Sequence, residues 1–389
     1  MRILFLHTHY QQHGGEDFVV DQEVALLSSN NEVKLITFSN RRGLVGAIQF
    51  FTSIFNIYTF LKIRREVLQF KPDVIHIHNW HFALGPLTFL LLSYFNIPII
   101  HTVHNFRLLC PSAILLAGNE IFTKSLEERF PWTAIKRKLY RGSYLQTFWL
   151  AFIIYAHKLL GSWSKIDAYI FLTAFSSTLF QKSKFSIPSE KCYLKPNFVD
   201  SSFCNTVKTH SGAYLFVGRL SYEKGIKVLL EVFIENGQPL EIIGDGDLRE
   251  SVIKTCEKYP NITYLGFQKK EYIQDRMTKA KALIFPSIWF EGMPMTIIEA
   301  FSNSLPIIAS NVGAMSTMII EKFNGMLFEV NNASSLSDVV NMFDAFSHAE
   351  KSTMAANAYQ DYIGKYTPDV NYHLLIDIYK DVIDKKLRS

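Results

Sequence analysis

Short apolar runs alternate along the whole 389-residue chain with stretches whose apolar residues recur at helical spacing. This alternation is typical of parallel sheets joined by crossover helices. It predicts six strands in the first half, at 3–7, 33–38, 74–78, 99–103, 168–172 and 192–194, and six in the second, at 214–217, 240–243, 262–265, 282–285, 307–309 and 326–328. We therefore expect an α/β protein with two doubly wound, parallel-sheet domains.

A polar segment at 200–211 separates the two sets of strands and indicates a linker. It places the domains at 1–200 and 201–368, a division that the chain length also favours. From 369 to 389 apolar residues return at helical spacing, which predicts a closing helix. The apolar stretch 82–100 is interrupted by glycine and proline, so we interpret it as a helix followed by a buried strand. A membrane span is the alternative.

Composition narrows the function classes. The net charge of +5 and the absence of a recognisable motif argue against nucleic acid as a partner. The chain opens directly on an apolar strand without the pattern of a secretory signal, so we expect a cytoplasmic protein. Scattered cysteines without C-x-x-C spacing favour free thiols in a reducing compartment: Cys110, Cys192, Cys204 and Cys256.

The most informative segment is 290–300, Phe-Glu-Gly-Met-Pro-Met-Thr-Ile-Ile-Glu-Ala, directly after a predicted strand. Pro294 is expected at the first position of a helix, where its missing N–H costs nothing. Free backbone N–H groups at Met293, Met295 and Thr296 would then point at an anion such as a diphosphate.

Two carboxylates belong to the same segment. Glu291 is predicted in the loop before the helix and Glu299 inside the helix. One carboxylate could hold sugar hydroxyls while the other holds a ribose diol. The alternative is an ordinary helix start that carries two surface glutamates.

A second candidate is the turn at 217–225, Val-Gly-Arg-Leu-Ser-Tyr-Glu-Lys-Gly, which also follows a strand. Arg219 and Lys224 supply two cations. A departing diphosphate needs its charge neutralised, and two cations can do this without a metal. We therefore expect no essential metal and no other cofactor; the alternative is a solvated basic loop.

Together the two segments resemble the retaining family-4 glycosyltransferases, which have the GT-B fold of two Rossmann-like domains facing across a cleft. The family's E-x7-E pattern is matched by Glu291 and Glu299, and its G-R-L-x-x-E-K-G pattern by 218–225.

The resemblance continues through the rest of the chain. The loop with Gly14 and Gly15 resembles the family's glycine loop beside the donor phosphate. Residues 102–105, Thr-Val-His-Asn, resemble its strand-end histidine motif. Residues 196–200, Pro-Asn-Phe-Val-Asp, resemble its P-N-G-V-D segment, with Phe198 in place of glycine. The closing helix is similar to the one that crosses back onto the N-terminal domain.

The resemblance implies a role for each matched residue. Arg219 and Lys224 would bind the diphosphate of a donor, most commonly a UDP-sugar, while Glu299 binds its ribose and Glu291 the transferred sugar. His104 would face the anomeric region or hold the acceptor. The other donor contacts would come from Gly14, Gly15, Gly244, Asp245, Gly246, Phe267, Gln268, Gly292, Met293, Pro294 and Met295, and acceptor contacts from Asn105 and Asn197.

Two patterns allow other interpretations. Asp245-x-Asp247 is similar to a metal-binding D-x-D, and the glycines around it to a dinucleotide fingerprint that lacks its third glycine. His76-x-His78 could be a zinc pair, because residues two apart share one face of a strand. With no cysteine or carboxylate partner nearby in sequence, we interpret these histidines as the ends of buried strands.

The acceptor side is sought in 105–165, a segment longer than a plain crossover requires. The cations at 136–138 lie near the aromatic residues of 148–155, as in a segment that lies on an anionic membrane surface. A buried helix beside a solvated basic loop is the alternative. The family resemblance implies a glycan or polyprenyl-diphosphate-linked acceptor, used in the synthesis of cell-surface polysaccharide or glycolipid.

Two other functions remain in competition. A sugar-nucleotide epimerase of related fold would use the same donor site, and a non-catalytic protein would only bind the nucleotide sugar. The match to E-x7-E favours transfer over epimerisation. The presence of both glutamates, both cations and His104 argues against an inactive site.

Overall fold

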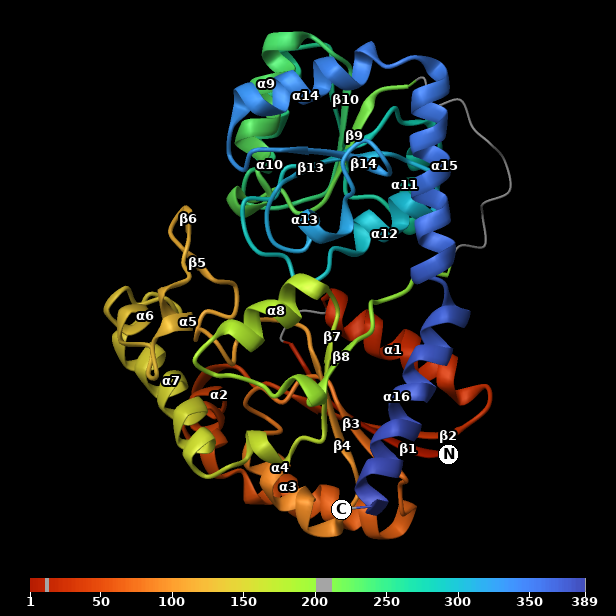
Figure 1. Cartoon of the computed structure of the whole chain (residues 1–389). Helices are drawn as coiled ribbons and strands as arrows, with labels where there is room; N and C mark the ends of the chain where they lie inside the picture. Colours follow the sequence, from red (N-terminus) through yellow and green to blue (C-terminus); the bar gives the residue numbers. More distant parts are fainter. Residues whose placement is uncertain (11–13, 201–211, 389) are drawn as a thin grey trace. The chain divides into compact units, whose positions relative to one another are not determined.

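The computed structural model describes residues 1–10, 14–200 and 212–388 (Figure 1). The remaining positions, which include most of the predicted linker and Cys204, lie outside the described residues. The chain divides into two compact units. The first comprises Met1–Ala117, Phe122–Asn197 and Asn371–Ser389, and the second Gly118–Ile121 and Phe198–Val370.

The first unit is built around a six-stranded parallel sheet of order β2-β1-β3-β4-β7-β8. Its strands are β1 (Arg2–His9), β2 (Glu32–Ser39), β3 (Val74–Ile77), β4 (Ile99–Val103), β7 (Ala168–Phe171) and β8 (Cys192–Leu194). Its helices before the closing one are α1 (Gly15–Ser28), α2 (Gly43–Thr52), α3 (Ile57–Phe70), α4 (Leu87–Leu92), α5 (Lys124–Glu127), α6 (Trp132–Lys136), α7 (Tyr144–Leu159) and α8 (Ala174–Lys182).

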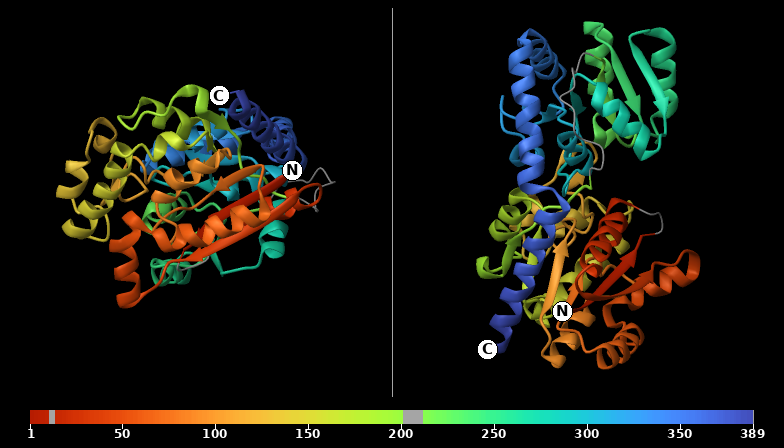
Figure 2. Two further views of the ribbon diagram at one scale, coloured as in Figure 1. Left: turned by 90° about the horizontal axis from the view of Figure 1, so that it is seen from below. Right: turned by 90° about the vertical axis from the view of Figure 1, so that its right-hand side faces the viewer.

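The closing helix α16 (Pro368–Arg388) covers one face of this sheet (Figures 1 and 2). Leu375 and Tyr379 are fully buried in one core cluster with Ile3 and Phe5 of β1. Full burial of each such side chain contributes about 1.5–3 kcal/mol. The closing helix therefore forms part of the first unit's core.

The second unit repeats the plan with a parallel sheet of order β11-β10-β9-β12-β13-β14. The strands are β9 (Tyr214–Val217), β10 (Leu240–Ile243), β11 (Ile262–Gly266), β12 (Leu283–Phe285), β13 (Ile307–Ser310) and β14 (Gly325–Phe328). The helices are α9 (Ile226–Asn236), α10 (Arg249–Lys258), α11 (Lys270–Lys279), α12 (Met295–Ser302), α13 (Met315–Met318), α14 (Ala333–Ala345) and α15 (His348–Lys365).

The twelve predicted strands and the doubly wound fold class are thus confirmed. In the second sheet the strand order reverses between β9 and β12. In open α/β sheets the loops that leave such a pair of strands separate, and ligands bind between them. The two predicted donor motifs follow these two strands.

Three local features bear on the predicted elements: one was not predicted, one differs from its prediction and one confirms it. The hairpin of β5 (Leu116–Ala117) and β6 (Glu120–Ile121) was not predicted, because its strands are too short to show a period. Pro294 caps α12 instead of starting it: its ψ of 109° is extended, so Met295 is the first helical residue. The stretch 82–100 holds α4 and then β4, as predicted.

None of the described helices is by itself long and apolar enough to cross a bilayer. The bent pair Gly43–Phe55 and Ile57–Phe70, with 67° between its members, meets the criteria of length and composition when taken together.

The loops after β9 and β12, where the strand order reverses, approach each other closely at one glycine. Gly225, between Lys224 and α9, has the left-handed φ of 74°. A Cβ built on it would lie 1.9 Å from the carbonyl oxygen of Pro286, which follows β12. Any side chain at 225 would push apart the two loops that carry the donor motifs.

We predict that Gly225→Ala destabilises the second unit far more than Gly237→Ala. Both glycines have a left-handed φ and flank α9, but a Cβ at Gly237 meets nothing within 4 Å. Gly237→Ala should lower the free energy of unfolding by about 1 kcal/mol from backbone strain alone. Gly225→Ala adds a backbone clash and should cost more than about 3 kcal/mol.

Urea unfolding of the two variants checks this prediction. Equal losses of free energy would show that the approach of Gly225 to Pro286 is not a constraint on the fold.

Candidate functional site

In the second unit, the loops after β9, β10 and β12 are joined by backbone hydrogen bonds. The N–H of Leu220 donates to the carbonyl of Asp245 at 2.9 Å, and the N–H of Ile288 donates to the carbonyl of Glu223 at 2.9 Å. Main-chain bonds of this kind hold loops in fixed positions. The side chains of the two predicted donor motifs therefore project from a rigid platform.

Glu291 is the electrostatic centre of this platform. Its carboxylate is almost fully buried, and its Oε1 atom accepts from Lys224 Nζ at 2.6 Å, Ser287 Oγ at 2.7 Å and Trp289 Nε1 at 2.7 Å. Burial alone would raise the pKa of Glu291, but the charge of Lys224 and the three donors outweigh it and lower that pKa. Glu291 is therefore ionised, and among the described residues no donor contacts its Oε2 atom.

The other two predicted charges lie in different environments. Arg219 keeps 70% of its side chain exposed and lies 4.0 Å from Glu223. Glu299 is half-buried within α12, and burial raises its pKa, opposed by the charge of Lys270. Arg219 is thus accessible to an anionic ligand, while Glu299 is a carboxyl with little water around it.

The loops after β10 and β11 carry the remaining predicted donor contacts. Gly244 passes so close to Gly218 that a Cβ would lie 1.8 Å from its carbonyl oxygen. Asp245 is exposed, and its Oδ1 accepts from the N–H of Gly246 at 2.8 Å. Phe267 has 79% of its surface exposed, which suits it to stack on a flat ring.

The remaining predicted donor contacts lie in the loop after β11 and at the start of α12. Gln268 donates from Nε2 to the carbonyl of Leu265 at 2.5 Å. Gly292, Met293 and Met295 are half-buried around Pro294, at the N-terminal end of α12. Among the described residues, two clusters of side chains bring possible metal-ligand atoms close together. Neither cluster includes Asp245 or Asp247.

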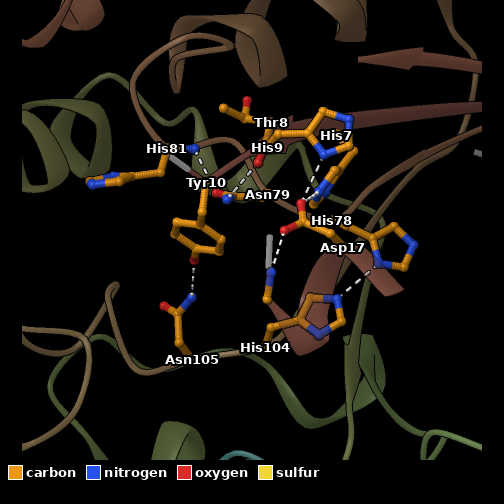
Figure 3. Close-up of polar contacts among 11 residues, drawn as sticks. His7, Thr8, His9, Tyr10, Asp17, His78, Asn79, His81, His104 and Asn105 are labelled. Atoms are coloured by element: carbon orange, nitrogen blue, oxygen red, sulfur yellow. Dashed lines mark hydrogen bonds and ion pairs between the residues drawn. The ribbon is translucent and has the colours of Figure 1, made fainter. Parts of the chain in front are cut away.

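In the first unit, polar side chains gather at the carboxyl ends of β1, β3 and β4 (Figure 3). Asp17 of α1 accepts through Oδ1 from His7 Nε2 and His9 Nδ1, both at 2.8 Å, and through Oδ2 from the N–H of Gly14 at 2.9 Å. Gly14 is the N-cap of α1 and Gly15 its first residue. The predicted glycine loop is thereby anchored to the end of β1.

His104 belongs to a chain of side chains that runs into the core. Its Nε2 lies 2.8 Å from Nδ1 of His78, whose Nε2 faces a carboxylate oxygen of Glu23 at 3.4 Å. Glu23 is ion-paired with the fully buried Lys195. The carboxylate charge favours the His78 tautomer with its proton on Nε2; in that tautomer His78 Nδ1 accepts from His104, and Nδ1 of His104 is an acceptor.

Burial holds the pKa of His104 and of His78 well below the usual range, and neighbouring histidines add to the effect. Both rings are therefore neutral at physiological pH. A neutral His104 with an acceptor nitrogen can take a hydrogen bond from a substrate hydroxyl.

The histidine pair considered for zinc has protein partners. His76 is bonded through Nδ1 to the hydroxyl of Tyr379 at 2.7 Å and through Nε2 to the hydroxyl of Thr102 at 2.7 Å. Ligand-type atoms of Glu23, His76 and His78 nevertheless lie within 4.8 Å of one another, as do those of His7, His9 and Asp17. The bonds of His76 favour a buried structural role.

The sequence interpretation missed Glu23, whose signal is nonetheless present. Glu23 lies four residues after Val19 and four before Leu27, on the apolar face of α1. A carboxylate on such a face must find a buried partner. The identity of that partner, Lys195, could not be inferred because it is distant in sequence.

The two predicted acceptor residues differ in access. Asn105 is half-buried and donates to the hydroxyl of Tyr10 at 3.3 Å. Asn197 is buried. Only Asn105 therefore has a surface that a ligand can reach in the structure of this unit.

We predict that the first unit loses stability as the pH falls below about 6.5. Burial is the largest cause of a lowered pKa in seven histidines of this unit: His7, His76, His78, His81, His101, His104 and His157. For His101 it lowers the pKa to about 4. Their ordinary pKa is about 6.5, so below that pH the unfolded chain binds protons that the folded one excludes. This contribution to stability is complete above pH 6.5 and is lost as the pH falls toward the folded values.

Glu16 acts in the opposite direction, since burial raises its pKa to about 8, but it is one group against seven. Calorimetry at pH 7.5, 6.5 and 5.5 should show a falling transition temperature for the first unit. A constant or rising temperature over this range would contradict the assignment of neutral histidines.

Comparison with known proteins agrees with this geometry. Residues 203–361 match the family described as Glycosyl transferases group 1, and residues 13–203 match Glycosyltransferase Family 4. Together the two models cover nearly the whole chain. Each matches one of the two halves in which a set of predicted site residues gathers.

Curated relatives match over shorter stretches. An uncharacterized glycosyltransferase of Methanocaldococcus jannaschii is 30% identical over 128 residues, 32% of this chain and 36% of that protein. The UDP-Gal:alpha-D-GlcNAc-diphosphoundecaprenol alpha-1,3-galactosyltransferase of Escherichia coli is 30% identical over 143 residues, 33% of this chain and 35% of that protein. These alignments thus span about a third of the relatives' own lengths.

Solved structures extend the similarity of fold to the whole chain. Sucrose-phosphate synthase from Thermosynechococcus elongatus superposes with a TM-score of 0.71 at 16% identity, over 99% of this chain and all of that one. Anabaena HepE in complex with UDP gives a TM-score of 0.68 at 15% identity, over 98% and 100%. The chain therefore belongs to the family-4 (group 1) glycosyltransferases and has their GT-B fold.

Proposed function

We propose that the protein transfers a sugar from a nucleotide-diphosphate sugar to a glycan or lipid-linked acceptor. The observation that carries this proposal is the ion pair of Lys224 and Glu291 at the strand-order reversal of the second sheet. It puts a cation for the diphosphate beside a carboxylate for the sugar. Both are held on backbone-bonded loops.

The chemistry follows from these charges. Lys224 and Arg219 neutralise the charge that grows on the departing diphosphate, which is the main demand of glycosyl transfer from such donors. Glu291 already binds three donors through Oε1, so its Oε2 can accept from a sugar hydroxyl. Glu299 takes the ribose hydroxyls, and Phe267 stacks on the base. No step in this scheme requires a metal.

We propose further that the anomeric configuration is retained. No residue stands out in the sequence as a covalent nucleophile, and in this proposal the acceptor attacks from the face that the diphosphate leaves. The phosphate oxygen takes the acceptor's proton, and the protein contributes orientation and charge. His104 holds a hydroxyl through its acceptor nitrogen.

The comparisons support a UDP-sugar and an acceptor of cell-surface synthesis. The E. coli relative is described as using UDP-Gal and a diphosphoundecaprenol-linked sugar, and HepE was crystallised with UDP. We therefore propose a UDP-sugar donor and a hexosyl group as the part transferred.

We predict that the protein releases UDP slowly from one UDP-sugar of a panel, and faster when an acceptor is present. NMR of the product should show the anomeric configuration of the donor. An inverted linkage contradicts retention. Interconversion of sugars without release of UDP indicates an epimerase, and binding without any reaction a non-catalytic protein.

A matched pair of lysine variants links this activity to the site. Lys224→Met should lower kcat/KM by about 100-fold or more, as removal of one preorganised charge-stabilising group does. Lys227→Met removes an exposed cation three residues later, on α9, and should retain activity. Thermal unfolding of both separates loss of the ion pair from loss of fold; equal activities would contradict the role of Lys224.

We also propose that the protein is cytoplasmic and works at the inner face of a membrane, through the segment 105–165. Lys136, Arg137 and Lys138 are exposed at the end of α6. Trp132 of the same helix and Tyr144 and Leu145 of α7 are exposed apolar or aromatic side chains. Cations beside such side chains suit the surface of anionic lipids.

Replacing the three cations at 136–138 by glutamine should weaken sedimentation with phosphatidylglycerol vesicles by about tenfold or more, because each cation contributes about 1 kcal/mol. The matched control replaces Lys227, Lys254 and Lys258, which are exposed in the second unit. If both triple variants lose the same amount of binding, only the net charge matters and the proposed surface is wrong.

A further inference from the structure

A pocket of about 580 Å³ in the first unit has no part in the donor site described above. Among the described residues it is lined by four arginines, Arg41, Arg42, Arg107 and Arg141, and by no aspartate or glutamate. Arg107 and Arg141 both lie against the ring of Tyr140, at 5.9 and 5.3 Å from its centre. So many guanidinium groups on one concave surface favour a ligand with several anionic oxygens.

Two helices begin at the same pocket. Gly43 and Gly46, from the first turn of α2, line it, as do Ser143 and Gln146 at the start of α7. A helix N-terminus carries a partial positive charge and unpaired N–H groups, so each adds to the attraction for an anion. On α2 no side chain caps these groups.

His81 supplies independent evidence that a ligand belongs here. It lines the pocket with 4% of its surface exposed, and neither ring nitrogen has a hydrogen-bond partner among the described residues. Buried polar groups without partners are rare and costly. Burial and the charges of Arg107 and Arg141 keep the pKa of His81 well below its usual range, so the neutral ring offers one donor and one acceptor.

One carboxyl lies close to this cationic surface. Glu16 interacts with Tyr10 and Arg107, and burial raises its pKa to about 8. At neutral pH it is mostly protonated and cancels little of the positive charge.

An apolar face adjoins the cationic pocket. Leu44, Ile48 and Phe51 follow one another at helical spacing on α2 and are exposed, Leu44 by 85% and Ile48 by 63%. Phe51 lines the pocket itself, and so does the exposed Leu145 of α7. A ligand with an anionic head and an apolar chain would match both parts of this surface.

We propose that this pocket binds the diphosphate of a diphosphate-linked isoprenoid lipid, whose chain lies along the exposed face of α2. The proposal rests on the proposed function, because this lipid would be the carrier of the sugar acceptor. A smaller pocket lined by His104 and Asn105 shares His81 and Arg107 with the larger one. The sugar attached to the diphosphate is thereby directed toward His104.

Titration calorimetry of the full chain with farnesyl diphosphate tests the proposal. Farnesyl diphosphate should bind more tightly than inorganic pyrophosphate or farnesol, since only it offers both the anion and the chain. Arg42→Gln with Arg141→Gln should weaken its binding at least about tenfold, the equivalent of one lost charge-assisted contact. Both residues are exposed, so the fold should be preserved.

A second double variant tests the apolar part. Leu44→Ser with Ile48→Ser should reduce the affinity for farnesyl diphosphate toward that for pyrophosphate and leave the binding of pyrophosphate unchanged. Lys182→Gln with Lys184→Gln removes the same charge from exposed positions of the same unit and should bind like the unaltered protein.

The outcomes separate this proposal from the donor chemistry and from general membrane binding. The arginine variant should still release UDP slowly from the donor sugar and should still sediment with phosphatidylglycerol vesicles. Equal loss in the lysine control, unchanged affinity in the arginine variant, or loss of vesicle binding in parallel with loss of farnesyl diphosphate would overturn it. If the unaltered protein binds farnesyl diphosphate through the arginines but cleaves no donor, the pocket stands and the proposed transfer fails.

Discussion

The contact between Gly225 and the carbonyl of Pro286 sets the geometry of the second unit's site. It joins the loops after β9 and β12, the two strands at which the order of the sheet reverses. Because the loops lie this close and the N–H of Ile288 bonds the carbonyl of Glu223, Lys224 beside Gly225 meets Glu291 a few residues beyond Pro286. An almost fully buried carboxylate without a partner would be very unfavourable, so the ion pair stabilises the loop arrangement in turn. A diphosphate that binds here must compete with Glu291 for Lys224, which couples the binding of phosphate to the state of the carboxylate.

The first unit handles buried charge in a different way. Glu23 and Lys195 form one fully buried ion pair, and around it the histidines are kept neutral by burial. The closing helix takes part, since Asn371 accepts from Lys195 and Tyr379 bonds His76. The orientation of His104 at the surface therefore depends on residues from both ends of the chain.

The fold was predictable from sequence because parallel strands buried on both faces form short apolar runs with sharp ends. The donor motifs were predictable because each is continuous in sequence and follows one strand. Partners distant in sequence were not: Glu23 and Lys195 are separated by 172 positions, and nothing local links them. The arginine pocket was missed for the same reason, since 41–42, 107 and 141 form no pattern until the loops after β2 and β4 and the loop before α7 come together. The position of Pro294 relative to α12 was predicted wrongly, because only the backbone torsion decides whether a proline caps a helix or begins it.

The two proposed anion sites differ in the cations they use, and the chemistry explains the difference. The donor diphosphate gains charge as it leaves, and Lys224 is a compact charge on a flexible stem that can move from Glu291 to a phosphate oxygen. The diphosphate of the acceptor lipid keeps its charge during transfer and has only to be held. Planar guanidinium groups stacked on Tyr140 suit that task, because they bind phosphate oxygens in pairs and lose little freedom in doing so. Thus a lysine paired with a carboxylate lies at the proposed donor site, where charge changes, and a cluster of arginines lies at the proposed acceptor site, where it does not.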